Sequence, residues 1–150
     1  GRGHVVATVG AVRRQRPSQR SPEAAAAPRP GMDKDSDSDK SLAAADVLAK
    51  EHGIEVEIVD PRTLRPLDLD TILASVRKTG RCVVVHEAPL TLGMGAEISA
   101  RIMERAFDSL QAPVARVTGW DVPYPPAVLE QSYLPSVARI ADAVRATVAY

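Results

Sequence analysis

The chain has 150 residues, the size of one ordinary domain, and its net charge at neutral pH is zero. Balanced charge argues against a nucleic-acid partner, because phosphate binding needs a basic face. Cys82 is the only cysteine, which excludes an internal disulfide framework and fits a reducing compartment. No apolar run reaches the length of a membrane span, so we expect no membrane association.

The first forty residues differ from the rest. The stretch from His4 to Gly10 is β-branched, so residues 1–12 contain a possible first strand. Residues 13–40 are polar and proline-rich, and we expect a disordered insert or linker there, because such a segment has little to bury. Its alternating aspartates lack the glycine and glutamate of a calcium loop and predict a solvated linker. They are Asp33, Asp35, Asp37 and Asp39.

Residues 41–150 are regular and predict one domain. Ser41 is in a position to cap a helix over residues 42–52, and Gly53 is in a position to end it. The apolar, partly alternating run at 54–59 predicts a strand.

A second helix and a buried strand are predicted next. Asp68 or Asp70 begins the helix and Gly80 ends it. The continuous apolar run at 82–85 is typical of a strand that is buried on both faces.

The last third of the chain predicts a long helix at about 96–110, a strand at 113–117 and a final helix near Pro135. The residues expected on the inner side of the long helix are Ile98, Ile102, Met103, Ala106, Phe107 and Leu110. Strands that alternate with helices through short connections indicate an α/β domain with a mainly parallel sheet flanked by helices. Three strands leave the edge incomplete unless residues 4–10, or a segment outside the chain, complete it.

Two places could carry chemistry. His86 and Glu87 follow the buried strand, where α/β sheets collect ligands, yet adjacent strand residues point to opposite sides. A histidine that bonds a neighbouring loop or subunit is the favoured interpretation. Gly93 and Gly95 could cradle an anion at a helix start, but a tight turn that brings the helix close to the sheet fits better. Trp120 and Tyr124, among prolines, suggest an interface anchor.

A series of short motifs runs from Gly53 to Tyr150. They are Asp60–Asp68, Lys78–Arg81, Val84–Pro89, Gly95–Ile98, Ala112–Val114, Gly119–Pro125, Tyr133–Pro135 and the chain end Ala149–Tyr150. In this order and spacing they resemble the C-terminal domain of beta subunits in 2-oxo acid dehydrogenase complexes, a transketolase C-terminal domain. The run from His86 to Thr91 is most similar to the branched-chain (2-oxoisovalerate) members, although pyruvate-type and acetoin-type subunits share much of it.

The resemblance implies the transketolase C-terminal fold and a part in the oxidative decarboxylation of a 2-oxo acid. In the intact enzyme, thiamine diphosphate and Mg would be bound by the beta subunit's N-terminal domain and by the alpha subunit. This chain would bind neither of them. The implied partners are the alpha subunit, a second beta subunit and the lipoyl acyltransferase core. The location would be the bacterial cytoplasm, or the mitochondrial matrix in a eukaryote.

No catalytic, cofactor-binding or metal-binding residue is carried over from this family. A structural motif is expected at three residues, with Arg62 pairing with a carboxylate and Asp68 capping a helix. These residues are Asp60, Arg62 and Asp68. An interface or docking role is expected at His86, Glu87, Trp120, Asp121, Tyr124 and Tyr150.

Residues 13–40 depart from the family, which enters this domain with a strand followed directly by a helix. Their Arg, Ala and Pro content leads us to expect a truncated or frameshifted gene product that is inactive alone. Two other functions stay open: a non-catalytic interaction module of the same fold, and a nucleotide- or flavin-binding domain that uses the Gly93 loop.

Overall fold

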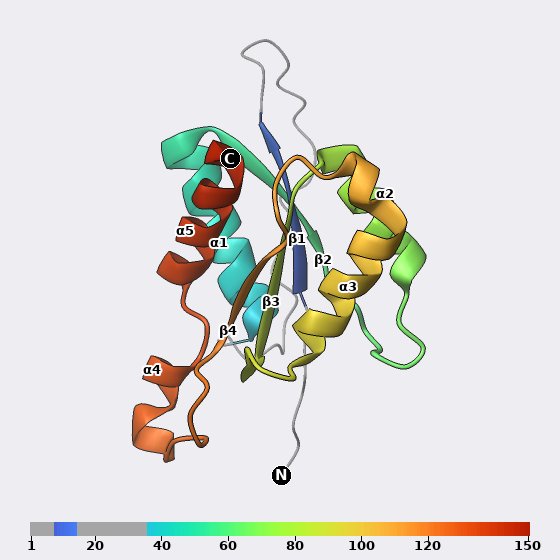
Figure 1. Ribbon diagram of the computed structural model, residues 1–150. Helices are drawn as coiled ribbons and strands as arrows, with labels where there is room; N and C mark the ends of the chain where they lie inside the picture. The colour runs from blue at the N-terminus through green and yellow to red at the C-terminus, as the bar shows by residue number, and fades with distance from the viewer. Residues whose placement is uncertain (1–7, 15–35) are drawn as a thin grey trace.

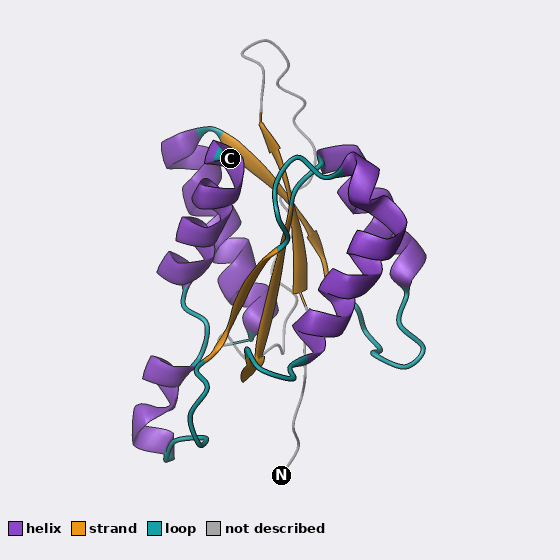
Figure 2. Ribbon diagram, viewed as in Figure 1, coloured by secondary structure: helices purple, strands orange, loops and turns teal. Residues whose placement is uncertain are grey.

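A four-stranded sheet lies between two pairs of helices in the computed structural model, which describes residues 8–14 and 36–150 (Figures 1 and 2). The strands are β1 (Thr8–Arg14), β2 (Ile54–Val59), β3 (Cys82–Pro89) and β4 (Ala115–Gly119). The main helices are α1 (Asp37–His52), α2 (Leu69–Thr79), α3 (Met94–Ala106) and α5 (Val137–Ala149). Among these residues, no helix combines the length and apolar composition that crossing a bilayer requires.

The strand order is β2-β1-β3-β4. Strands β2, β3 and β4 run in one direction, and β1 is antiparallel to both of its neighbours. The predicted α/β class is therefore confirmed, with one strand reversed. The first strand was expected to complete an edge, but it lies inside the sheet, where both of its hydrogen-bonding edges are paired.

The position of β1 also corrects the predicted linker at residues 13–40. Arg13 and Arg14 pair with Glu55 and Ile54 of β2, so they belong to the strand. Their backbone hydrogen bonds make up for the low apolar content that suggested disorder. Residues 1–7 and 15–35, which include Asp33 and Asp35, lie outside the described residues.

Helix α1 starts earlier than predicted. Ser36, and not Ser41, is the N-cap, and its side chain accepts a hydrogen bond from the Asp39 backbone N–H at 3.1 Å. Asp37 and Asp39 stand in the first turn, where the helix dipole favours negative charge. Residues 36–40 are thus not a solvated linker, and Asp37 is only 1% exposed.

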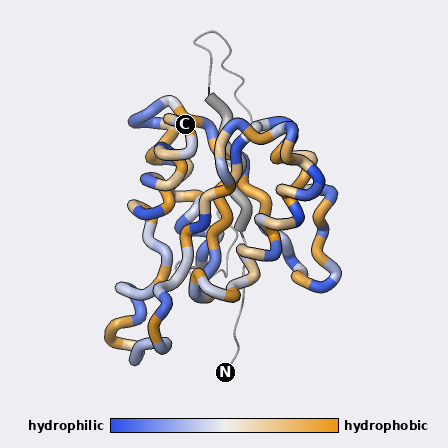
Figure 3. Tube along the Cα trace, viewed as in Figure 1, coloured by the Kyte–Doolittle hydropathy of each residue, from blue (hydrophilic) through white to orange (hydrophobic). Residues whose placement is uncertain are grey.

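Strand β3 builds both halves of the core, as expected of a strand buried on both faces. Cys82 and Val84 face α2 and α3, whereas Val83 and Val85 face α1 and α5. Figure 3 shows the matching pattern, with hydrophobic strands at the centre and mixed hydropathy along the helices. This alternation sends the next two residues, His86 and Glu87, toward opposite helical layers.

Helix α3 is shorter than predicted and turns into a 3-10 helix, η1 (Phe107–Ser109). Its buried side consists of Gly95, Ile98, Ile102 and Ala106, spaced three or four residues apart. The expectation that Met103 and Phe107 face inward is wrong, because these side chains are 50% and 67% exposed. Met103 and Phe107 lie on a different side of the helix from the four buried residues.

The segment between β4 and α5 carries two short helices, η2 (Ala127–Leu129) and α4 (Glu130–Tyr133). It projects beyond the body of the domain, as the α4 label marks in Figure 1, and parts of it are hydrophobic in Figure 3. Helix α5 begins at Val137, after the Ser136 N-cap, near Pro135 as predicted, and Ile140, Val144 and Val148 are buried.

Candidate functional site

The loops that follow β3 and β4 meet at one edge of the sheet, because these parallel strands end on the same side. The Asp121 carboxylate joins them by accepting hydrogen bonds from the Thr91 backbone N–H at 3.0 Å and from the Thr91 hydroxyl at 2.7 Å. These bonds hold the pKa of Asp121 below its usual value. Arg116 adds a third tie by donating to the Leu90 carbonyl at 3.0 Å.

Trp120 is fixed in place although 52% of it is exposed. Its indole N–H donates to the Ser132 carbonyl at 3.1 Å, and the Arg139 guanidinium lies 4.2 Å from its ring centroid. Arg139 also donates to the Thr118 carbonyl at 2.7 Å, so the cation is tied to β4. Trp120 is therefore held at the surface by one hydrogen bond and by the cation that lies over its ring.

Two tyrosines extend this arrangement. Tyr133 is buried, and Tyr124 meets it edge to face, with ring centroids 5.0 Å apart. The Tyr124 hydroxyl donates to Glu130, which raises the pKa of Tyr124 to about 12. A Cβ on Gly119 would lie 2.6 Å from the Tyr133 ring, so this glycine lets the ring approach the end of β4.

Exposed apolar side chains gather on these loops, and we name them together the β4-loop surface. They are Leu92, Trp120, Val122, Tyr124, Val128 and Leu129. Leu92 is 98% exposed and has a positive φ of 59°, which is costly for a leucine. Grouped apolar exposure of this kind is typical of surfaces that bind a partner.

His86 lies at the same edge but is fully buried. Its Nε2 accepts a hydrogen bond from the Gly95 backbone N–H at 3.2 Å, which places the ring proton on Nδ1. Burial lowers the pKa of His86, against an opposing effect of the Ala88 backbone. A Cβ on Gly95 would lie 2.4 Å from Nε2, and one on Gly93 would lie 2.6 Å from Cε1.

The imidazole therefore occupies space that the glycines leave open, and the tight turn predicted at Gly93 and Gly95 brings α3 close to β3. We call this contact the His86 junction. His86 has no exposed surface to offer a partner, so its predicted docking role is replaced by a structural role within the chain. The predicted bond to a neighbouring loop is the part of the interpretation that the geometry matches.

Glu87 points to the opposite side, toward α1. The pKa of Asp37 is raised to about 7, mainly by burial and further by the negative charge of Glu87. The positive charge of Lys40 acts in the opposite direction. Neither Asp37 carboxylate oxygen has a hydrogen-bond partner within the described part of the chain. A carboxyl group in this position tends to keep its proton near neutral pH.

The predicted structural motif at Asp60, Arg62 and Asp68 is divided between two places. Asp68 is the N-cap of α2 and accepts hydrogen bonds from the Thr71 backbone and hydroxyl, which lower its pKa. Arg62 lies 3.9 Å from Asp60 in an exposed ion pair, and Asp60 also accepts from the Ser38 hydroxyl at 3.1 Å. Tyr150, at the chain end, is 80% exposed.

No pattern in the sequence indicates a role for Thr91 and Arg139, which fix the two loops. Thr91 meets Asp121 across 30 residues, and Arg139 meets Thr118 across 21. An aspartate that follows a strand and a threonine in the preceding loop are too common to predict such a pair.

A family model described as "Transketolase, C-terminal domain" matches residues 36–140. The chain belongs to the transketolase C-terminal domain family. The match begins at the N-cap of α1 and reaches Ile140 in α5, so it covers β2, β3, β4 and the loops that carry the β4-loop surface.

Several beta subunits of dehydrogenases are similar to the chain over two thirds or more of its length. The chain is 51% identical to "3-methyl-2-oxobutanoate dehydrogenase subunit beta" of Mycobacterium tuberculosis, over 69% of the chain and 30% of the relative. It is 52% identical to "2-oxoisovalerate dehydrogenase subunit beta" of Pseudomonas aeruginosa, over 67% and 29%. For "Pyruvate dehydrogenase E1 component subunit beta" of Leifsonia xyli the identity is 49%, over 73% and 32%.

A solved structure described as "Split gene transketolase, inactive beta4 tetramer" matches with a TM-score of 0.60 and 28% identity, over 73% of this chain and 34% of that one. The transketolase-type fold expected from the motifs is thereby confirmed. The chain spans about a third of the length of the curated relatives that it matches.

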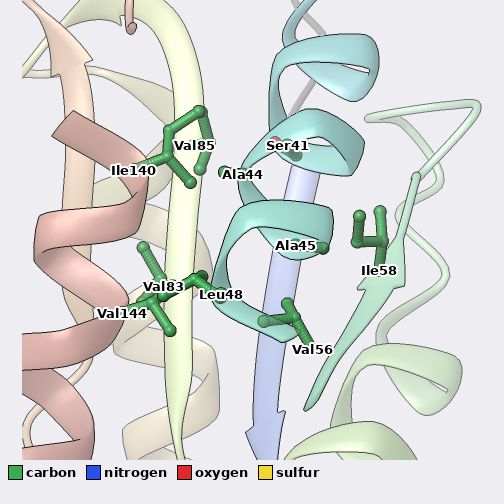
Figure 4. A pocket seen from close by; sticks show the side chains of 10 residues that line it. All are labelled: Ser41, Ala44, Ala45, Leu48, Val56, Ile58, Val83, Val85, Ile140 and Val144. Atoms are coloured by element: carbon green, nitrogen blue, oxygen red, sulfur yellow. The ribbon is translucent and has the colours of Figure 1, made fainter. Parts of the chain in front are cut away.

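A small pocket opens between α1, the sheet and α5 (Figure 4). Its walls are apolar except for Ser41, and it has room for little more than one water-sized group. The residues lining it are Ser41, Ala44, Ala45, Leu48, Val56, Ile58, Val83, Val85, Ile140 and Val144.

Within residues 8–14 and 36–150, no group of three His, Cys, Asp or Glu residues could hold a metal ion. The described residues therefore do not fit a magnesium-bound diphosphate cofactor, because the pocket is apolar and small and no set of metal ligands lies close together.

Proposed function

We propose that this chain is the C-terminal part of the beta subunit of a thiamine-diphosphate-dependent 2-oxo acid dehydrogenase of the branched-chain type. Its role is to join subunits and to help dock the lipoyl acyltransferase core. The observation that carries this proposal is the β4-loop surface, in which Trp120 and Tyr124 are exposed yet held by Arg139 and Glu130. Rigid, half-exposed aromatic side chains are what protein interfaces use as anchors.

The proposed division of labour leaves the chemistry to other parts of the enzyme. Thiamine diphosphate and Mg²⁺ would be bound by the beta subunit's N-terminal domain and by the alpha subunit. The pocket between α1, the sheet and α5 supports this, because it is apolar and water-sized. The chain alone is then inactive in 2-oxo acid decarboxylation.

Docking is assigned to the β4-loop surface and to the chain end at Tyr150. Asp121 and Glu130 place negative charge beside the exposed rings of Trp120 and Tyr124, so the surface suits a partner that is apolar at its centre and basic at its rim. Tyr150 is a second exposed aromatic available to a partner. The location that goes with this function is the bacterial cytoplasm, or the mitochondrial matrix in a eukaryote.

The test is binding of the full chain to two purified partners, the alpha subunit and the acyltransferase core of a 3-methyl-2-oxobutanoate dehydrogenase complex. We expect micromolar or tighter binding to at least one of them. Trp120→Ala should weaken it by about tenfold or more, because a central interface aromatic is worth roughly 1.4 kcal/mol or more. Leu42→Ala, which alters a half-exposed side chain on α1, is the matched control and should have no effect.

Two results would contradict the proposal. The first is the absence of binding to both partners by a chain that is shown to be folded. The second is micromolar binding of thiamine diphosphate to the chain itself in calorimetric titration, since that would place the cofactor site here. Binding to the partners without any contribution to decarboxylase assembly would favour a non-catalytic interaction module.

A further inference from the structure

The buried side of helix α1 changes in chemical character along the helix. In the first two turns the most deeply buried side chains are polar: Asp37, Ser38 and Ser41. The buried apolar side chains follow these, with Ala44 and Leu48, which are both 0% exposed. Packing of an apolar face supplies most of the stability of a helix within a domain, so the start of α1 is held less firmly than its end.

Few hydrogen bonds join residues 36–43, which we call the α1 lid, to other elements. Within the described part of the chain one side-chain bond does so, from the Ser38 hydroxyl to the Asp60 carboxylate at 3.1 Å. The bonds between the N-cap Ser36 and Asp39 stay inside the lid. Moving the lid away from the sheet therefore breaks few polar contacts between elements.

Asp37 makes the lid sensitive to ionisation. The residue is 1% exposed, and neither of its carboxylate oxygens has a hydrogen-bond partner among the described residues. A protonated carboxyl group is neutral and tolerates this position, whereas a buried carboxylate without a donor is far more costly. Release of the lid is the least costly way to return an ionised Asp37 to water, because the lid is the weakly held part of the helix.

The charged groups around Asp37 favour the same response. Glu87 of β3 opposes ionisation by its negative charge, and Lys40, on the lid itself, acts in the opposite direction. After β2, the Asp60 carboxylate is paired with an exposed arginine, and at the start of α5 Arg139 is tied to a carbonyl of β4. The two arginines are thus engaged elsewhere, and an ionised Asp37 gains no hydrogen bond by staying buried.

The α1 lid also closes one end of the apolar pocket. Ser41 is the polar residue in the pocket wall, and Figure 4 shows it at the same end as Val85 and Ile140. Its hydroxyl is buried and has no hydrogen-bond partner in the described part of the chain. The other α1 residues that line the pocket lie beyond the lid. When the lid moves, this end of the pocket opens to solvent while the rest of the helix stays in place.

We propose that the α1 lid is a pH-controlled closure of this pocket, closed while Asp37 carries its proton and open once the carboxyl group is ionised. Burial, which raises the pKa of Asp37 from 3.8 to about 7, brings the change into the neutral range. Between these values the closed lid keeps a proton that the open lid loses. Opening therefore becomes more favourable by about tenfold for each pH unit up to 7, and levels off above it. The inference goes beyond the proposed docking function and does not depend on it.

Hydrogen exchange of the full chain tests the lid. The backbone amides of residues 40–43 exchange when the lid opens, and those of residues 48–51 belong to the anchored end of α1. At pH 7.5 the first group should be less protected than the second. Protection of the first group, corrected for the intrinsic exchange rate, should fall by about twentyfold from pH 5.5 to 7.5. Equal protection of the two groups would overturn the inference, because α1 would then open as one unit.

Two variants assign the effect to Asp37. Asp37→Asn is neutral at every pH, so the protection of residues 40–43 should hardly change between pH 5.5 and 7.5. Asp46→Asn, on the exposed side of α1 beyond the lid, is the matched control and should keep the pH dependence of the parent chain. A pH dependence that persists in Asp37→Asn would overturn the inference.

Thiol labelling tests whether the pocket opens, and it needs no change at Asp37. The thiol introduced by Ser41→Cys lies in the pocket wall, and the one introduced by Ala49→Cys is exposed on the anchored part of α1. The ratio of their labelling rates, taken at the same pH to cancel thiol ionisation, should rise about tenfold or more from pH 5.5 to 7.5. The native Cys82 is buried, with its pKa raised to about 12, and does not interfere. A constant ratio would overturn the proposed closure.

Discussion

The His86 junction and the β4-loop surface lie at the same edge of the sheet and use their residues in opposite ways. At the junction a polar ring is fully buried, and two glycines leave the space that it fills. In the β4-loop surface, large apolar rings remain exposed, while polar atoms of Thr91, Asp121 and Arg139 hold the loops in place. The contrast teaches that residue type alone does not tell packing from binding: here the histidine packs and the tryptophan is available to bind.

The largest expected effect comes from filling the junction. Gly95→Ala places a methyl group 2.4 Å from the Nε2 and 2.7 Å from the Cδ2 of His86, whose ring is fully buried. We expect the free energy of unfolding, measured with urea, to fall by about 3 kcal/mol, the upper range for overpacking. Gly53→Ala is the control: nothing lies within 4 Å of its added methyl, so only the positive φ of 63° costs stability, about 1 kcal/mol. Equal losses in both variants would contradict a tightly packed junction.

The pH dependence should separate the two buried groups on either side of β3. The pKa of Asp37 is raised from 3.8 to about 7, so between these values the folded chain keeps a proton that the unfolded chain loses, and stability falls as the pH rises. The pKa of His86 is lowered from 6.5, so below 6.5 the unfolded chain binds the extra proton, and stability falls as the pH drops. The two slopes oppose each other below pH 6.5, where lowering the pH favours the protonated Asp37 of the folded chain but also protonates the histidine of the unfolded chain.

Asp37→Asn removes one of these slopes. We expect the variant to gain stability relative to the parent chain as the pH is raised from 5.5 to 7.5, since the parent must then bury a charged carboxylate. Urea unfolding at both pH values measures the difference. Asp46→Asn, on the exposed side of α1, is the control. A difference between variant and parent that does not change with pH would mean that Asp37 is not desolvated.

Substitutions in the β4-loop surface should lower the free energy of unfolding far less than Gly95→Ala does. Trp120→Ala removes the contact with Arg139 and the bond to Ser132, and we expect a loss of about 1 kcal/mol in unfolding free energy, as for a cation–π contact at a partly exposed site. The fold should survive while partner binding drops. Thermal melting checks stability, and Arg139→Lys, which keeps the charge, should lose less than the tryptophan variant. A loss comparable to that of Gly95→Ala would show that Trp120 is a structural residue and not an anchor.

The smallest effect is expected at the tie between the two loops. Asp121→Asn weakens its hydrogen bonds with Thr91 without opening the core, so global stability should be unchanged. The Thr91 backbone amide should nevertheless exchange its hydrogen faster, because local opening is no longer opposed by the carboxylate. Hydrogen exchange measured at this amide decides. Unchanged exchange would mean that the loops are held by Arg116 and not by Asp121.

Much of the fold could be predicted from the sequence because local signals and the core agree. Gly53 and Gly80 both end helices with positive φ, and Asp68 begins one, as their residue types indicated. The run at 82–85 predicts a strand that contributes to the core on both faces, and it does so, since only Cys82 and aliphatic side chains occur there.

The misses come from contacts between distant parts of the chain. The Asp- and Ser-rich start of α1 has the composition of a solvated linker. Its interactions with Glu87 of β3 and with Asp60, directly after β2, make it part of the domain. Met103 and Phe107 have the hydrophobicity of core residues, and the position of the sheet decides which side of α3 is buried. The sequence places His86 at an interface, because nothing in it shows how closely the backbone of Gly95, nine residues later, approaches the histidine ring.

Leu92 shows a trade-off between keeping the free chain stable and keeping it ready to assemble. It holds a backbone conformation that costs a leucine about 1–2 kcal/mol, and with 98% of its side chain in solvent it receives almost no packing energy in return. Glycine at this position would relieve the strain and make the unassembled chain more durable. A residue that weakens its own domain can be kept by selection if its benefit arises in the complex, so stabilising substitutions at this loop are expected to slow assembly.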